Sequence, residues 1–396
     1  MGVGWSGGPG LGELDRVFPP DLINAVIDKT GCREVRSRRL PSHVMVAFCL
    51  ARALWCPDPY REVLRRLIPA GAGAAPADKA AVFRARLRVG PAPMAELLTQ
   101  VGPQAQAGTP GAFHRRWHLM IADGTTVKVA DHRANVAAFG RPGSGKGPAA
   151  YPVVKVMALI ESGTHIVIDA ELGGCRASER ELAGPLWRHL APGDLLIGDA
   201  GLPSVPICRM LTERGVDVLF RVPDSWALVA AKMLPDGSYL AVAKTATSTP
   251  AAARDAMTLR VIEYRLDDPG RDGAIVYRLV TTITDPDAAP AAELAALYAE
   301  RWEAETTLAE IKSMLIGAGT VLPSKHPDLV RQEIYAHLAV HAGIRALIHQ
   351  VAIGHPDRLD PDRFSFTAAL RAVRRSITGG PAISPPLPAT QPIGGR

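Results

Sequence analysis

The sequence predicts an α/β protein in which helices flank a mixed β-sheet, with an all-α region before the sheet and a β-rich insertion within it. Three observations predict this class. Residues 113–221 alternate short apolar strands with helical segments, which is typical of a sheet covered by helices. Residues 1–112 show apolar residues at helical spacing, and residues 222–290 carry further alternating strands. The segment 298–312 contains no Gly or Pro and favours a helix.

The composition is that of a globular protein with a modest positive charge. The chain has 396 residues, enough for more than one domain, and its 47% hydrophobic content excludes a disordered chain. The net charge of +6 suits a polyanionic partner such as DNA. No apolar run of membrane-spanning length occurs, and the five cysteines form no C-x-x-C pair that would indicate a zinc finger. We therefore expect a cytoplasmic protein with reduced thiols.

Residues 1–112 predict a helical DNA-binding domain. Arginines cluster at Arg36, Arg38 and Arg39, and they recur on the faces of the short helices that follow. Such helices are typical of compact DNA-binding modules, although an all-α domain with a solvated basic surface gives the same pattern. The Gly/Pro-rich run 102–111 predicts the end of this domain.

Two carboxylates follow strands of the predicted core. Residues 117–130 have the pattern of a hairpin that turns at Gly124, with Asp123 at the end of its first strand. Asp199 directly follows the buried strand 195–198. The carboxyl ends of strands are where an open α/β sheet presents ligands. Turn chemistry explains each aspartate equally well when it is taken alone.

Three other acids of the core compete for the same role. Asp194 follows Pro-Gly and has the setting of a turn residue. Asp169 lies inside its strand, where the register decides its exposure, and Asp131 is a third rival. The sequence pattern alone leaves these rivals open.

The helix predicted over residues 298–312 offers a further candidate acid. At about 100° per residue, Tyr298, Arg301, Glu305 and Lys312 share one narrow face, whereas the other glutamates of the segment lie about 120 to 200° away. Phase therefore singles out Glu305 as an acid between two cations and a phenol. A solvated face with i,i+4 ion pairs remains the alternative.

The three acids could perform metal-dependent chemistry on DNA. Asp123, Asp199 and Glu305 come from separate segments, and hard oxygen ligands suit Mg²⁺ or Mn²⁺. Two such ions about 3.5–4 Å apart can stabilise the attacking and leaving oxygens of an in-line phosphoryl displacement. Arg301 and Lys312 would then hold DNA phosphates.

The same residues carry a resemblance to a known family, the DDE transposases of the insertion-sequence-four family. Its YREK signature has a tyrosine, an arginine, a glutamate and a lysine at fixed spacing, which is matched by Tyr298, Arg301, Glu305 and Lys312. The segment that begins at Asp123 is similar to the first-acid motif of the family, and Asp199 is similar to its second acid. The resemblance covers about residues 12–378.

This resemblance implies an RNase H-like core in which Asp123, Asp199 and Glu305 form the metal-binding catalytic triad, with Mg²⁺ or Mn²⁺ as cofactor. It implies an enzyme that cuts DNA at the ends of a mobile element and joins the freed 3′-hydroxyl to target DNA. Implied partners are double-stranded element ends with inverted repeats, target DNA and a second copy of the chain, in a nucleoid-associated complex. The implied DNA-binding residues are Tyr298, Arg301, Trp302, Lys312, Arg36, Arg38 and Arg39.

The resemblance also divides the chain. The expected parts are a helical DNA-binding domain (1–112), the first part of the core (113–221), the β-rich insertion (222–290), a helical completion of the core with a C-terminal arm (291–378) and a disordered tail (379–396). One departure concerns Asp199, which is followed by Ala200 where the family often has arginine. This departure keeps an alternative open, a catalytically impaired or repurposed transposase-derived DNA-binding protein.

Overall fold

The computed structural model describes residues 10–36, 38–56, 58–67, 78–144, 147–222, 226, 228–244, 256–266, 275–357 and 359–377. The tail 379–396, which was expected to be disordered, lies outside the described residues.

The first part of the described chain is helical. Pro20 begins α1, where its missing N–H removes no helical hydrogen bond, and Gly31 follows the end of α1 with a φ of 67°. Arg36, Arg38 and Arg39 are exposed in the loop between α1 and α2. The final helix of this N-terminal part, α5, was not predicted. The elements are a 3₁₀ turn Gly12–Arg16, α1 Pro20–Lys29, α2 Ser42–Leu54, α3 Tyr60–Leu67, α4 Lys79–Val89 and α5 Ala92–Val101.

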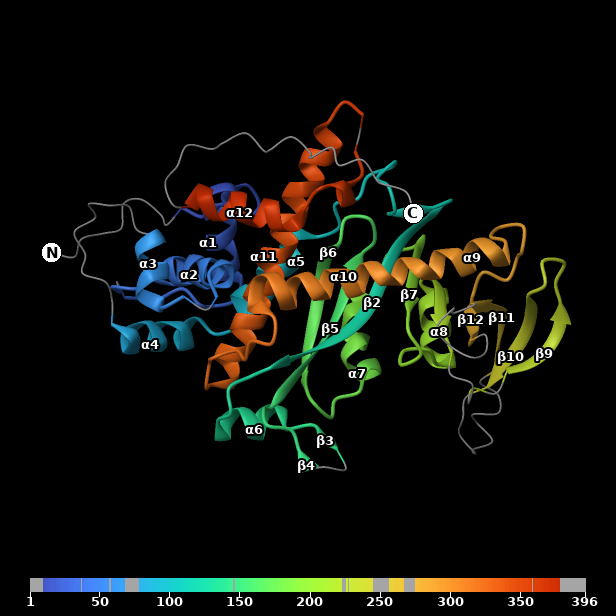
Figure 1. Ribbon diagram of the computed structural model, residues 1–396, viewed down its shortest axis with the longest axis horizontal. Coiled ribbons are helices and arrows are strands. Elements are labelled where there is room, and N and C mark those ends of the chain that lie inside the picture. The colour runs from blue at the N-terminus through green and yellow to red at the C-terminus, as the bar shows by residue number, and fades with distance from the viewer. Residues whose placement is uncertain are drawn as a thin grey trace.

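One mixed sheet extends from these helices to the far end of the molecule, in the strand order β6-β5-β2-β7-β8-β12-β11-β10-β9, with β1 paired to β2 (Figure 1). The pairs β2–β7 and β7–β8 are parallel, and the other pairs on this path are antiparallel. The strands of the expected insertion, β9 to β12, continue the core sheet because β12 pairs with β8.

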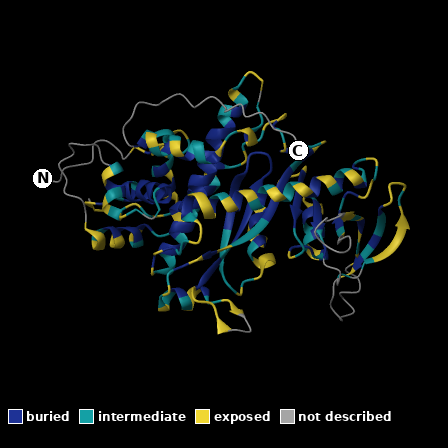
Figure 2. Ribbon diagram, viewed as in Figure 1, coloured by how far each residue is buried: buried dark blue, intermediate teal, exposed yellow. Residues whose placement is uncertain are grey.

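The strands of this sheet are β1 Phe113–His114, β2 Trp117–Lys128, β5 Val153–Glu161, β6 Ile166–Gly174, β7 Asp194–Gly198, β8 Asp217–Arg221, β9 Leu228–Met233, β10 Tyr239–Lys244, β11 Ala256–Leu266 and β12 Ile275–Thr281. A separate ribbon pairs β3 Gly143–Ser144 with β4 Gly147–Pro148. The central strands are buried, whereas β9 is largely exposed at the edge of the sheet (Figure 2). The core therefore lies at β5, β2 and β7, where both faces are covered.

The predicted hairpin at Gly124 is wrong. Residues 117–128 form one continuous strand, β2, and Asp123 lies in its middle opposite Ala158 of β5. Asp-Gly is a local turn signal, but β2 pairs with β5 on one side and β7 on the other. Two ladders of backbone hydrogen bonds outweigh the local preference.

The later helices pack against the sheet and against the N-terminal helices. In Figure 1, α9 and α10 run across the sheet near β2 and β7, and α10 packs against β2. The long helix α11 packs against β6 on one side and α2 and α5 on the other, which explains why it is buried nearly all round. None of the helices within the described residues is long and apolar enough to cross a membrane. The helices of this part are α6 Arg133–Phe139, α7 Glu179–Ala183, α8 Val205–Glu213, α9 Ala291–Leu297, α10 Arg301–Glu310, α11 Pro327–Gly354 and α12 Phe366–Ile377.

A cluster of polar side chains connects the start of β2 with β5 and β7. His118 contacts Glu161 of β5 through Nε2 at 3.0 Å and Asp194 of β7 through Nδ1 at 3.1 Å. Glu161 is fully buried and also accepts hydrogen bonds from the backbone N–H groups of Gln104 and Ala105, at 3.0 Å each. Burial alone lowers the pKa of His118, but the two carboxylates outweigh it and raise this pKa to about 9.

We expect this cluster to make stability depend on pH. The folded-state pKa of His118 lies above its unfolded value, so its stabilisation is fully present below about pH 6.5 and is lost as pH rises through about 9. The loss should reach roughly 3 kcal/mol in the free energy of unfolding. Urea unfolding between pH 6.5 and 10 measures it. His118→Gln should remove the slope, and an unchanged slope in that variant would assign the pH dependence to other groups.

Candidate active site

Parallel pairing places three chemically active side chains in one row across the sheet. The register pairs Ala122 of β2 with Gly198 of β7, so Asp123 and Asp199 are the next residues on neighbouring strands. Gly198 pairs in turn with Phe220 of β8, so Arg221 continues the row. The Nη1 atom of Arg221 lies 4.0 Å from Oδ1 of Asp199.

Helix α10 adds the third acid. Arg301 donates to Oε1 of Glu305 at 2.6 Å, and its Nη1 atom lies 3.6 Å from Oδ2 of Asp123. The guanidinium thus lies between the acid of the strand and the acid of the helix. In the 3₁₀ turn Tyr298–Glu300 just before α10, the Tyr298 hydroxyl makes a long hydrogen bond of 3.5 Å to Asp199. Arg301 therefore joins Asp123 to Glu305, and Tyr298 of the same predicted signature contacts Asp199.

The opposite face of α10 is fixed to the core. Glu303 accepts hydrogen bonds from Ser162 Oγ at 2.9 Å and from the Gly163 N–H at 2.7 Å, in the turn between β5 and β6. Glu310 accepts from Arg345 of α11 at 3.1 and 2.5 Å. These glutamates have structural partners on the other side of the helix, as their phase predicts. Such anchoring holds the backbone that presents Glu305.

Burial and neighbouring charges shift the pKa of Asp123 in opposing directions. Burial is the main cause that raises the pKa of Asp123, and the negative charges of Glu305 and Asp199 raise it further. The Gly124 N–H and Arg301 oppose this rise. Burial and the charge of Asp199 also raise the pKa of Tyr298, which keeps its hydroxyl protonated as a hydrogen-bond donor. Three carboxylates therefore lie close enough for their charges to affect one another, with Arg301 paired to two of them.

A pocket of about 550 Å³ opens beside these acids, between β2 and the end of α10. Asp123, Glu305 and Lys312 line it, together with Lys128 of β2. Lys312 belongs to a π-helical turn, Ile311–Gly317, which follows α10 and was not predicted. Asp199 lies outside this lining, one strand away.

Trp302 lies apart from this pocket. It is 64% exposed and lines a second pocket on the other side of α10. Its predicted contact with DNA stays a prediction.

The three acids are neighbours, but their carboxylate oxygens are not all close enough together to bind one metal ion. Within the described residues, three ligand atoms that lie within 4.8 Å of one another occur at His165, Glu303 and Asp362 rather than at the predicted triad. Arg301 explains the wider spacing, because its guanidinium pairs with both Asp123 and Glu305. The donor set consists of carboxylate oxygens alone, which fits Mg²⁺ or Mn²⁺ once Glu305 turns from Arg301 toward the aspartates.

The rival acids have structural partners. Oδ1 of Asp131 pairs with Arg141 at 2.5 Å. Asp194 accepts from the N–H of Ala191 at 2.7 Å, in addition to its contact with His118. The third rival is buried inside β6, where Asp169 forms an ion pair with Arg188 and contacts His189.

Sequence reasoning missed Arg221. It ends the strand that follows Asp199, and its side chain also stacks over the ring of Tyr277 at 4.9 Å. The strand that ends at Arg221 could be predicted, but not its parallel pairing with β7, which brings Arg221 and Asp199 to one edge of the sheet. Arg221 supplies a guanidinium beside Asp199, where Ala200 offers none.

Comparisons with known proteins identify the family of the chain. Residues 9–99 match the family model of the insertion element 4 transposase N-terminal region, and residues 118–341 match that of the transposase DDE domain. The InsG transposase of insertion sequence element IS4 from Escherichia coli K12 is 28% identical over 374 residues, which are 93% of this chain and 83% of the relative. InsZ, a putative transposase of the same organism, is 26% identical over 228 residues, which are 56% of this chain and 74% of the relative.

A solved structure shows a similar fold. The piggyBac transposase, determined by cryo-EM in a synaptic complex with hairpin DNA, aligns over 92% of this chain and 79% of its own with a TM-score of 0.51 and 11% identity. This likeness and the matched DDE domain confirm the predicted RNase H-like core. The chain belongs to the insertion-sequence-four family of DDE transposases, so it is a metal-dependent enzyme that cuts DNA strands and transfers them.

Proposed function

We propose that Asp123, Asp199 and Glu305 bind the divalent metal ions, Mg²⁺ or Mn²⁺, with which this transposase cuts the ends of a mobile element and joins them to target DNA. The observation that carries the proposal is the parallel register that makes Asp123 and Asp199 neighbours, with Glu305 tied to Asp123 through Arg301. When bound, a pair of such ions would activate the attacking oxygen and stabilise the leaving oxygen at phosphorus.

The residues around the acids would orient the carboxylates or contact the phosphates of the DNA. Arg301 orients Glu305 and Asp123 by pairing with both, and it would become available to a phosphate when Glu305 turns toward the metal site. Tyr298, protonated at neutral pH, would donate a hydrogen bond to a backbone phosphate. Arg221 would contribute positive charge beside Asp199. This last contact supports catalysis over the impaired alternative that Ala200 suggests.

DNA would approach along the face that carries the first pocket. Lys312 and Lys128 line that pocket and place positive charge next to the acids. The exposed loop between α1 and α2 offers Arg36, Arg38 and Arg39 to the duplex. The partners proposed are element ends with inverted repeats and target DNA, held by a homodimer on paired ends in the nucleoid of the cytoplasm, with Trp302 as a further DNA contact.

The direct test is strand cleavage and joining on a duplex that carries an element end, with and without Mg²⁺. The proposal predicts metal-dependent nicking at the element boundary, followed by transfer of the 3′ end to a second duplex. Salt-sensitive binding without any metal-dependent cutting would instead support the impaired DNA-binding alternative.

Replacement of Lys312 by alanine should weaken binding to DNA evenly across sequences. One lost phosphate contact should lower the slope of log K against log salt by about 0.9. Fluorescence anisotropy at several salt concentrations measures this slope. Lys232→Ala, which changes an exposed lysine of β9 at the far end of the sheet, is the matched control and should leave the slope unchanged. Equal slopes for both variants would remove Lys312 from the DNA interface.

A further inference from the structure

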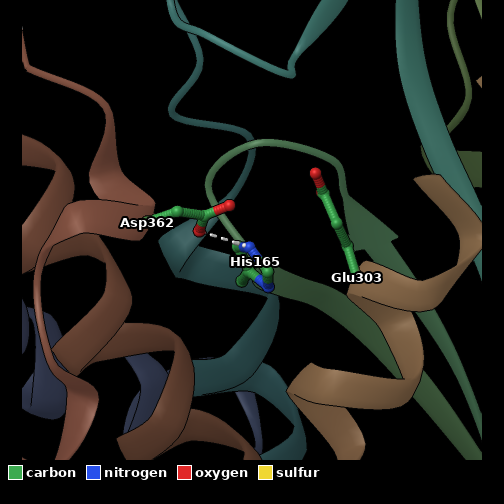
Figure 3. A group of neighbouring side chains, drawn as sticks. All are labelled: His165, Glu303 and Asp362. Carbon is green, nitrogen blue, oxygen red and sulfur yellow. Dashed lines mark ion pairs between the residues drawn. The ribbon is translucent and has the colours of Figure 1, made fainter. Parts of the chain in front are cut away.

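A second group of chemically active side chains lies on the other side of α10 from the acids. His165, Glu303 and Asp362 come from three segments: the turn between β5 and β6, helix α10, and the 3₁₀ turn Pro361–Arg363. One ligand atom from each lies within 4.8 Å of the other two (Figure 3). They line the second pocket, of about 540 Å³, which gives a small ion and its water ligands access.

His165 is held with one ring nitrogen directed at this group. The residue is 3% exposed, and its φ of 59° is a left-handed conformation that is uncommon for a side chain with a Cβ. Nδ1 lies 3.1 Å from the Thr307 hydroxyl, a contact that fixes the ring. Nε2 is buried and has no hydrogen bond of acceptable geometry, although Asp362 Oδ1 lies only 2.7 Å away. The dashed line in Figure 3 marks this contact between His165 and Asp362.

The contact at Nδ1 is one feature that histidine ligands of metal ions share. Histidines that bind metals are oriented by a hydrogen bond from the other ring nitrogen, the role that Thr307 fills here. Ligands about 2.1 Å from one ion lie about 3 to 3.5 Å apart, so a small side-chain rotation would close the 4.8 Å span.

Glu303 is prepared for the same role. Its Oε2 atom is fixed by Ser162 and the Gly163 N–H. Asp362 contributes a second carboxylate, which is about half exposed on the side of the pocket.

We propose that His165, Glu303 and Asp362 bind one divalent transition-metal ion of the Zn²⁺ class. An imidazole nitrogen in the ligand set favours such an ion over Mg²⁺, which takes oxygen ligands. The ion would join the β5–β6 turn, α10 and the C-terminal segment, and so hold the helix that carries Glu305. This site is distinct from the proposed catalytic centre, because its ligands lie on the opposite side of α10 and in a different pocket.

The test uses the full-length chain with Asp123→Asn, Asp199→Asn and Glu305→Gln, so that the proposed catalytic ligands are absent. After removal of metal, this protein is titrated with Zn²⁺ against a competing chelator, and with Co²⁺ while the visible absorption of the bound ion is followed. We expect one ion per chain. Adding His165→Asn or Asp362→Asn should weaken binding at least about tenfold. Asparagine tolerates the left-handed backbone at 165, and the exposed position of Asp362 provides a variant with little risk to folding.

His355→Asn is the matched control, because His355 is a partly exposed histidine 3.7 Å from Asp357 and outside the group. It should bind the metal as the triple variant does. Absence of stoichiometric Zn²⁺ binding by the triple variant would overturn the proposal and leave a simple ion pair between His165 and Asp362. Weakening by only one of the two added substitutions would overturn the assignment of the three ligands. Neither result bears on the proposed catalytic triad, which the test protein lacks.

Discussion

Asp199→Asn should abolish Mg²⁺-dependent cleavage of an element end. The substitution keeps the shape of the side chain but removes one of the charged oxygens on which the metal ions depend. A loss of about 4 kcal/mol of transition-state stabilisation corresponds to about a thousandfold in rate. The side chain is 46% exposed, so we expect little change in stability. Single-turnover cleavage at saturating DNA separates this effect from binding.

Asp131→Asn is the control for this experiment. Asp131 is another exposed aspartate of the core, and its carboxylate pairs with Arg141 rather than with the proposed site. It should cut at the parental rate. If Asp199→Asn also cuts at the parental rate while binding DNA normally, Asp199 is not part of the catalytic centre.

Arg301→Met should have the next largest effect. The guanidinium is mostly buried and connects Asp123 with Glu305, so its removal leaves two carboxylates without their shared cation. We expect cleavage at saturating DNA and Mg²⁺ to fall about a hundredfold, comparable to the loss of one preorganised donor. Arg301→Lys should keep part of the activity, because it retains the charge but not the forked geometry.

Arg278→Met is the matched control for the loss of an arginine. Arg278 forms an ion pair with Glu263 at 2.9 Å, in the strands of the insertion. Its replacement should leave the rate of cleavage near the parental value. Parental rates for Arg301→Met as well would mean that this guanidinium neither orients the acids nor contacts DNA during the reaction.

The helix of the site could be predicted from the sequence because its information is local. A helical period of 3.6 residues puts Arg301 and Glu305 on one face and assigns Glu303 to another, and the structure shows these contacts. The strand before Asp199 could be predicted for a similar reason, since a short apolar run followed by Asp and Gly indicates a buried strand and its end.

What the sequence could not show depends on pairing between distant segments. Gly124 has a turn signal, yet its pairing with Met157 of β5 holds it within a strand. Arg221 reaches Asp199 only through the parallel register of β7 and β8. His165 and Asp362 are separated by nearly half the chain, and no spacing pattern connects them to each other. Each of these contacts is decided by tertiary structure, which local propensity does not encode.

The central claim is that Asp123, Asp199 and Glu305 hold the same metal ions during cleavage. The most direct measurement is metal rescue of Asp199→Cys on an element-end duplex, because Mn²⁺ accepts a sulfur ligand more readily than the hard Mg²⁺ does. We predict that this variant is inactive with Mg²⁺ and recovers cleavage with Mn²⁺, whereas the parent cuts with either ion. Equal activity of Asp199→Cys and the parent in Mg²⁺, or equal loss in both metals, would contradict direct metal binding by Asp199.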